Sequence, residues 1–419
     1  MRLPDHRSEE SMIAASVVMI VGLGVVAFLS QAYGYRLGGV MVVPLLVIYT
    51  LREPLSLVIF VTGTAAAWGV LWALREYTLN YGRRLFLAAV SVGAIATVAV
   101  GFAVSRLLPA QLPFENAEVI ASIFPGVTAY NLMRIEPENR RADLLAMAGC
   151  YAALVAVGTL SLALLARVGP PTPPVLALPT SDFVGWIGIE PRGTALATVT
   201  PSWLSISLLL VDVAIYEGFR KRYDLRLAGI IIIPLLAVFS VRYGPAIAVF
   251  SIGATAVFFL VSYVHWVTLL YGRVLLALSL GLGVLYALAI GVLRPVSAPG
   301  ITLFFIGLFV GIGAYNLHRV TPTNRRAHIR ISAALFAIFY ATIYAFVDVP
   351  ATGLISDGPV PYALVGIVVV GLAAVELRRL EASIPDAAAF ARESVFANVS
   401  VDGADIDDSP LVAETEEER

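Results

Sequence analysis

The chain has 419 residues, of which 59% are hydrophobic and only 14% are charged, and its 28 bases nearly balance its 29 acids. A soluble protein of this size carries about 25% charged residues, so most of this surface cannot face water. The composition excludes a soluble enzyme, a nucleic-acid-binding domain and a disulfide-stapled secreted module. It predicts that a lipid bilayer covers most of the chain.

Thirteen apolar runs, broken by charges, glycine and proline, are predicted to be membrane helices. Lipid offers the backbone no hydrogen bonds, and the runs do not alternate in polarity, so helices are expected and a strand barrel is not. The runs cover about 11–32, 38–51, 54–74, 85–108, 119–133, 143–166, 203–219, 227–241, 245–264, 274–293, 300–317, 329–347 and 360–376. The predicted fold is therefore an all-α polytopic transmembrane bundle.

Two runs of the first half are too short for an ordinary span. Val40–Leu51 carries Pro44 in its middle, and Val119–Met133 carries Pro125-Gly126 in its middle. At 1.5 Å per residue neither run reaches across a ~30 Å hydrocarbon core, and proline kinks a helix. They are predicted to be broken or re-entrant helices lining a substrate path, or else short tilted helices buried among neighbours.

The chain is a tandem duplication. Residues 33–101 align with residues 223–291 at a constant offset of 190, with 20 identities in 69 positions, and the offset then drops to 185. Each half has an even number of runs, so the halves are predicted to be parallel repeats about an axis along the membrane normal. The shared landmarks include Arg36 and Arg226, Pro44 and Pro234, Tyr81-Gly82-Arg83 and Tyr271-Gly272-Arg273, Asn131 and Asn316, Arg134 and Arg319, and Arg140-Arg141 and Arg325-Arg326.

The duplication divides the chain into a first membrane repeat (1–168), a Pro-rich linker (169–201), a second membrane repeat (202–348), an extra transmembrane helix (349–376) and an acidic tail (377–419) expected to be disordered. Loops on one predicted side hold eight basic residues, and those on the other hold sixteen. The positive-inside rule places the second side in the cytoplasm. We therefore expect a multi-pass protein of the cell membrane, with the N-terminus and linker outside and the tail inside.

Five groups of residues in the first half stand in a specific order and spacing. They are Gly38-Gly39 before Pro44, Tyr81-Gly82-Arg83-Arg84, Pro113-Phe114-Glu115-Asn116-Ala117-Glu118, Phe124-Pro125-Gly126, and Asn131 with Arg134. Their order resembles that of the PgsC/CapC family, the membrane subunit of poly-γ-glutamate synthesis. The resemblance covers about residues 15–165 and 205–347, and the second copy departs from it by lacking the acidic string and by carrying Val310 and Val274 in place of Pro125 and Arg84.

The resemblance implies a synthase and export complex for poly-γ-glutamate, in which this chain partners a PgsB/CapB-like ATP-dependent amide ligase and an export subunit. The only lysine, Lys221, does not lie in a phosphate-binding loop, so the chain is not expected to be the ligase itself. Neither a cofactor nor a metal site is expected, because the four histidines and Cys150 lack ligand spacing. A secondary transporter or flippase, and a pure membrane anchor for the ligase, are the alternatives.

The basic loops are the best candidates for binding. Guanidinium groups hold carboxylates through paired hydrogen bonds, although such residues also fix topology and bind lipid headgroups. Glu217 is expected to pair with Arg220, Lys221 or Arg222. The candidate residues for a polyanion path or for partner docking are Tyr81, Gly82, Arg83, Arg84, Glu115, Glu118, Pro125, Gly126, Asn131, Arg134, Arg140, Arg141, Tyr271, Gly272, Arg273, Asn316, Arg319, Arg325 and Arg326.

Overall fold

The computed structural model describes residues 10–52, 54–78, 82–107, 123–168, 200–293, 300–348, 353–354 and 359–384. Within these residues the chain folds into thirteen α-helices and one short 3-10 turn, with no strand. Eight of the helices are long and apolar enough to cross a membrane. The predicted all-α polytopic bundle is confirmed.

The helices follow the duplication, with six in each repeat. The first repeat contains α1 (Glu10–Tyr33), α2 (Val42–Arg52), α3 (Leu55–Tyr77), α4 (Gly82–Leu107), α6 (Phe124–Met133) and α7 (Arg140–Val168). The second contains α9 (Ser202–Tyr223), α10 (Ile232–Arg242), α11 (Ala246–Thr268), α12 (Gly272–Leu293), α13 (Gly300–His318) and α14 (Arg325–Phe346), with the 3-10 turn Pro322–Asn324 before α14. The last helix is α15 (Pro359–Ala382).

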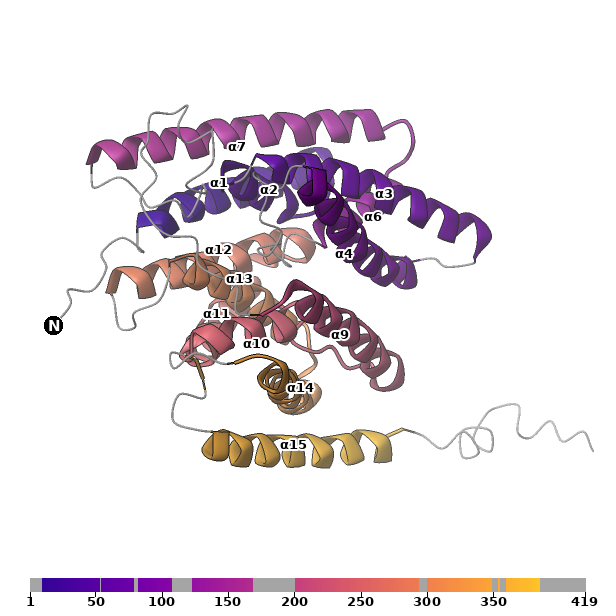
Figure 1. Ribbon diagram of the computed structural model, residues 1–419, viewed down its shortest axis with the longest axis vertical. Helices are drawn as coiled ribbons and strands as arrows, with labels where there is room; N and C mark the ends of the chain where they lie inside the picture. The colour runs from indigo at the N-terminus through magenta and orange to yellow at the C-terminus, as the bar shows by residue number, and fades with distance from the viewer. Residues whose placement is uncertain are drawn as a thin grey trace, which may run out of the picture.

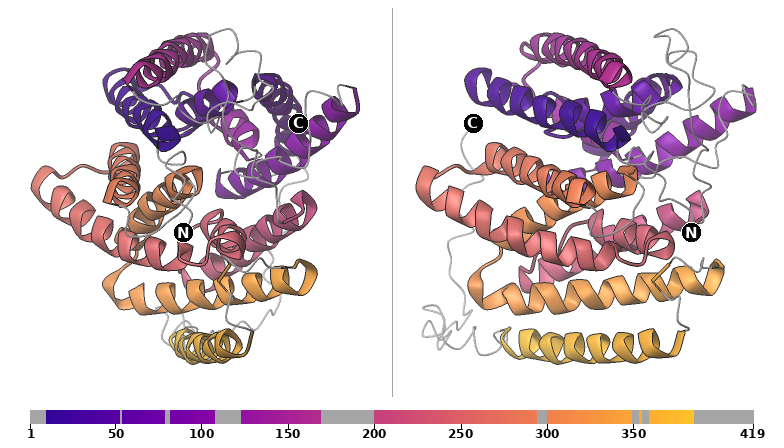
Figure 2. Two further views of the ribbon diagram at one scale, coloured as in Figure 1. Left: turned by 60° about the vertical axis from the view of Figure 1, so that its left-hand side comes forward. Right: turned by 90° about the vertical axis from the view of Figure 1, so that its left-hand side faces the viewer.

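The two repeats lie side by side, and α15 lies at the far edge of the second one (Figures 1 and 2). Between the repeats, α1 packs on α12 and α9 packs on α4. These two contacts exchange under the duplication, because α1 corresponds to α9 and α4 corresponds to α12. The contact of α1 is the more extensive one, since α1 also packs on α13, so the two-fold relation between the repeats is only approximate.

Within each repeat, two helices cross at glycine. A Cβ on Gly126 of α6 would overlap the main-chain oxygen of Ala89 on α4, and a Cβ on Gly311 of α13 would crowd the oxygen of Ser279 on α12. Only glycine lets the two backbones approach this closely, as is common in membrane helix packing. The same crossing is thus present in both copies.

The proline positions differ from the prediction. Pro44 is the third residue of α2 and Pro125 is the second residue of α6, so neither lies in the middle of its helix. The first amides of a helix have no intrahelical partner, and proline there removes no bond. The short elements are therefore proline-started helices, and residues 108–122 before α6 lie outside the described part. In the second repeat α13 runs unbroken through Val310, which replaces Pro125.

Large apolar side chains cover the outer surface of the bundle. Leu145 on α7, Trp266 on α11 and Ile367 on α15 are 74%, 77% and 69% exposed. Exposure of this kind on several helices suits a surface that faces lipid. The buried carboxylate of Glu376 on α15 pairs with Arg330 on α14 at 2.6 Å and fastens α15 to the second repeat.

Candidate functional site

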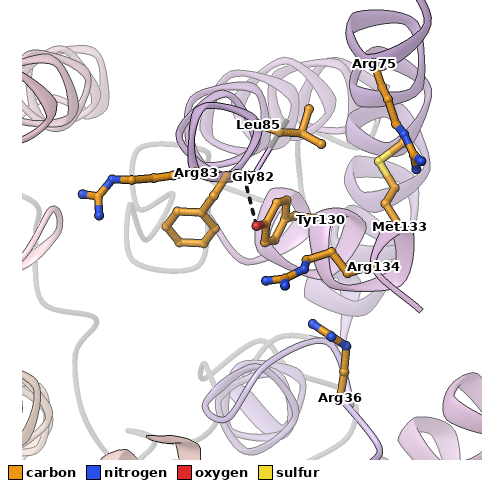
Figure 3. Close-up of a pocket in the computed structure, with 9 residues that line it drawn as sticks. Arg36, Arg75, Gly82, Arg83, Leu85, Tyr130, Met133 and Arg134 are labelled. Carbon is orange, nitrogen blue, oxygen red and sulfur yellow. Dashed lines mark hydrogen bonds between the residues drawn. The ribbon is translucent and has the colours of Figure 1, made fainter. Parts of the chain in front are cut away.

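Three connections of the first repeat meet at one end of the bundle and line an open pocket of about 740 Å³. The loop before α2, the end of α3, the start of α4 and the end of α6 each contribute to the wall. Because these are alternate ends of successive helices, they must lie on one side of the bundle. The lining residues are Arg36, Arg75, Gly82, Arg83, Leu85, Phe86, Tyr130, Met133 and Arg134 (Figure 3).

A tight turn between α1 and α2 places Arg36 at the pocket. Leu37, Gly38 and Gly39 have φ values of 50°, 69° and 138°, which glycine adopts without strain. The Asn131 amide on α6 donates to the Gly38 oxygen at 2.8 Å and to the Val127 oxygen at 3.0 Å. Asn131 therefore ties the end of α6 to this turn.

A buried carboxylate on α7, that of Asp143, fixes the first two residues of this turn. Oδ1 of Asp143 accepts hydrogen bonds from the backbone N–H groups of Arg36 at 2.6 Å and Leu37 at 3.2 Å. The main chain is thereby fixed, and the guanidinium of Arg36 extends toward that of Arg134 (Figure 3). Asp143 itself does not line the pocket.

The pocket carries strong positive charge. Four of its lining residues are arginines, of which Arg83 is ion-paired with Glu217 of α9, and none of the lining residues in the described part of the chain is acidic. Burial lowers the pKa of the Arg36 guanidinium, and the nearby charge of Arg134 lowers it further. The guanidinium carbon of Arg134 also lies 5.7 Å from the centroid of the Tyr130 ring, and this cation–π interaction stabilises its positive charge. Crowded guanidinium groups of this kind favour a ligand with several carboxylates.

The second repeat reproduces the framework of the site. The Asn316 amide donates to the Ala228 oxygen at 2.5 Å, and the Tyr315 hydroxyl donates to the Gly272 oxygen at 3.3 Å. These bonds correspond to Asn131 with Gly38, and to Tyr130 with Gly82 at 3.1 Å. The duplication has therefore preserved the hydrogen bonds together with the polar residues.

Several substitutions distinguish the copies at this end. His328 stands where the first repeat has Asp143, and its Nδ1 donates a hydrogen bond to the Arg226 oxygen at 2.6 Å. In the second repeat the turn is therefore held by its backbone carbonyl group, whereas in the first repeat it is held by two backbone N–H groups. His265 and His318 replace Arg75 and Met133 and pack ring against ring, with centroids 4.9 Å apart. Leu276 also replaces Phe86, so the second copy keeps the scaffold but changes three of the lining positions.

The structure brings some of the candidate residues together and separates others. Gly82, Arg83 and Arg134 line the pocket, and Asn131 lies directly beneath it. Arg140 donates to the Ile135 oxygen and braces the α6–α7 connection. The candidates Arg84, Arg141, Tyr271 and Arg326 are exposed and outside the pocket.

The remaining candidates are accounted for by packing or lie beyond the described residues. Pro125 and Gly126 serve the helix crossing. Arg319 and Arg325 lie over the rings of Tyr315 and Phe258. Tyr81, Glu115 and Glu118 fall outside the residues that the structure describes.

Two lining arginines were not among the candidates. Arg36 is matched by Arg226 in the duplication, and that repetition was a signal that could have identified it. Arg75 corresponds to His265, so comparison of the repeats gives no such signal. Its place in the pocket depends on the length of α3, which carries it to the same end as α6.

A family model described as capsule biosynthesis CapC matches residues 21–141 and 211–326, which together make up more than half of the chain. Each match falls within one repeat and ends near the start of α7 or α14. No curated protein and no solved structure matches the chain. The predicted family and the tandem repeat are confirmed by the two matches.

Proposed function

The chain belongs to the capsule biosynthesis CapC family, and on that premise we propose that it is the membrane subunit that receives and guides the polymer in a poly-γ-glutamate synthase and export complex. Family membership supports a membrane role in capsule synthesis. The polymer and the partner are inferred from the chemistry of the pocket and from the resemblance of the motifs.

The observation that carries the proposal is the guanidinium-lined pocket. Arg36, Arg75, Arg83 and Arg134 come from four separate segments and line one pocket of about 740 Å³, in which Arg36 and Arg134 lie close together while Arg83 points toward Glu217 of α9. Poly-γ-glutamate presents a free carboxylate on every residue, and a guanidinium binds a carboxylate through two parallel hydrogen bonds. A cluster of this kind also raises the local concentration of a polyanion before it is bound.

The partner in this proposal is an ATP-dependent amide ligase. The only lysine, Lys221, lies outside any phosphate-binding loop, which supports ligation in a separate chain. The excess of basic residues at the pocket end supports a cytoplasmic location for that end. The growing polymer would then be delivered from the ligase to the pocket on the same side of the membrane.

The test combines polymer yield with ligase retention. In cells that carry the ligase, Arg36→Gln and Arg134→Gln should lower cell-associated and released polyglutamate severalfold, since each removes one cation of the pocket. Arg378→Gln on the exposed surface of α15 is the charge-matched control and should leave yield unchanged. Protein level and ligase co-purification are measured for each variant.

The outcomes separate the alternatives. Unchanged polymer yield in both pocket variants, at normal protein level, would contradict a polymer-guiding role. If the ligase still co-purifies in that case, the chain is a membrane anchor. If the ligase does not co-purify even with the unaltered chain, a transporter or flippase that acts alone becomes the better explanation.

A further inference from the structure

The arginine of each Tyr-Gly-Arg motif reaches into the opposite repeat. At the start of α4, Arg83 pairs with Glu217 of α9, with Nε and Oε2 3.0 Å apart, and lies over the Tyr216 ring at 5.3 Å. At the start of α12, Arg273 donates through Nη2 to Oδ1 of Asn131 at 3.4 Å. The two repeats therefore exchange equivalent arginines across their interface.

The two exchanged arginines have different partners. Arg83 has a carboxylate, because Glu217 lies where α9 meets α4. The residue of the first repeat that corresponds to Glu217 is Ala27, which cannot pair with Arg273. In the described part of the chain, the side chain hydrogen-bonded to Arg273 is the neutral amide of Asn131, at a long distance. This guanidinium is half-buried and forms no ion pair with the residues that the structure describes, so its charge is only partly compensated.

The surroundings of Arg273 connect it to the pocket of the first repeat. Its guanidinium interacts electrostatically with those of Arg36 and Arg134, and with the carboxylate of Asp143. Oδ1 of that carboxylate already accepts two backbone N–H groups of the turn before α2. Three cations thus face one acid, Asp143, whose Oδ2 has no hydrogen-bond partner among the described residues, so the cluster keeps a net positive charge. Such an arrangement is stabilised by an anionic ligand.

We infer that Arg273 of the second repeat completes the carboxylate-binding site of the first repeat, together with Arg36 and Arg134. This inference rests on the proposed function and names the residue through which the two repeats share one site. The ion pair of Arg83 with Glu217 is the equivalent arrangement on the other side of the interface. There a carboxylate of the protein binds the arginine, whereas beside Arg273 a carboxylate of the polymer takes that position.

The test measures binding of a fluorescent γ-linked glutamate oligomer of about ten residues to the full chain in nanodiscs of phosphatidylcholine. Arg273→Gln should weaken binding about tenfold or more, as expected for a lost charge-assisted hydrogen bond. Arg378→Gln should bind as the unaltered chain does. Wild-type affinity in Arg273→Gln, with binding lost in Arg134→Gln, would show that the site belongs to the first repeat alone.

A second pair of variants does not depend on removing Arg273. Ala27→Glu copies Glu217 into the first repeat and should occupy Arg273 with an internal carboxylate, whereas Ala27→Gln has the same size without the charge. Only the glutamate variant should weaken oligomer binding. Equal binding by these two variants would overturn the inference even if Arg273→Gln failed to fold.

Two further outcomes are distinguishable. If the unaltered chain does not bind the oligomer at all, the proposed function itself fails. If a small mole fraction of phosphatidylglycerol displaces the oligomer, and Arg273→Gln abolishes that displacement, the cluster is a lipid-headgroup site and the inference is overturned.

Discussion

The side-chain amide of Asn131 donates a hydrogen bond to the main-chain oxygen of Gly38 at 2.8 Å, although the two residues are 93 positions apart. Asn316 makes the equivalent bond to Ala228. In each repeat this bond joins the end of a helix to the turn that carries an arginine, Arg36 in the first repeat and Arg226 in the second. The position of Arg36 therefore depends on a side chain outside the pocket wall.

Loss of this bond should destabilise the protein. Asn131→Ala leaves the buried Gly38 oxygen without its donor, and the expected cost is about 1–3 kcal/mol of unfolding free energy. Thermal unfolding of the detergent-purified chain measures the change, and Asn316→Ala should produce a similar loss in the second repeat. A melting temperature unaltered by both substitutions would mean that the turns are held by other contacts.

The glycine crossing should tolerate no side chain. Gly126→Ala would place a methyl group against the Ala89 carbonyl and force α6 away from α4, at a cost of about 1–3 kcal/mol or more. Gly149→Ala on α7 is the matched control, because no atom lies within 4 Å of its added carbon, and helix propensity should make it neutral or slightly stabilising. Expression level and thermal unfolding distinguish the two, and equal behaviour would refute the close crossing.

The attachment of α15 should depend on its buried acid. Glu376→Ala leaves Arg330 without its carboxylate, and breaking a pair with a buried member should cost about 1–3 kcal/mol. Glu381→Ala removes the exposed ion pair with Arg222 and the exposed hydrogen bond from the Tyr223 hydroxyl, and should have little effect. Limited proteolysis after α14 and thermal unfolding report on both variants. If Glu381→Ala proved the more damaging change, the helix would be held at its exposed end.

The parallel arrangement of the repeats can be tested by chemical labelling. Equivalent motifs lie at one end of the bundle, since Arg83 and Arg273 each contact the opposite repeat there. In a Cys150→Ala background, Arg84→Cys and Tyr271→Cys, both at exposed positions, should react with a membrane-impermeant maleimide in inverted vesicles and be protected in intact cells. Reaction from opposite sides would show that the repeats are inverted.

Hydropathy and the repeat alignment were sufficient to predict the helices, the duplication and part of the pocket. Arg83 and Arg134 were expected on the same side of the membrane because both follow apolar runs that end on that side. The place of Pro44 was predicted wrongly, because a hydropathy run merges the extended turn at Val40 with the helix that begins at Val42. Apolar composition does not distinguish those two backbone conformations.

The contacts between the two repeats could not be predicted from the sequence. For Glu217, local spacing indicated a partner within the following turn, and Lys221 does lie 4.0 Å away. The closer partner is Arg83, at 3.0 Å and 134 residues distant. Helix periodicity describes neighbours on one helix, whereas this pair depends on how α4 meets α9.

The difference between Glu217 and Ala27 has an evolutionary consequence. In an assembly of two identical chains, one codon specifies both members of a symmetric pair of positions, so neither can change alone. Joining the copies in a single polypeptide removes that restriction and fixes their ratio at one to one. Selection can then introduce an acidic residue in one repeat while the equivalent position of the other repeat stays unchanged.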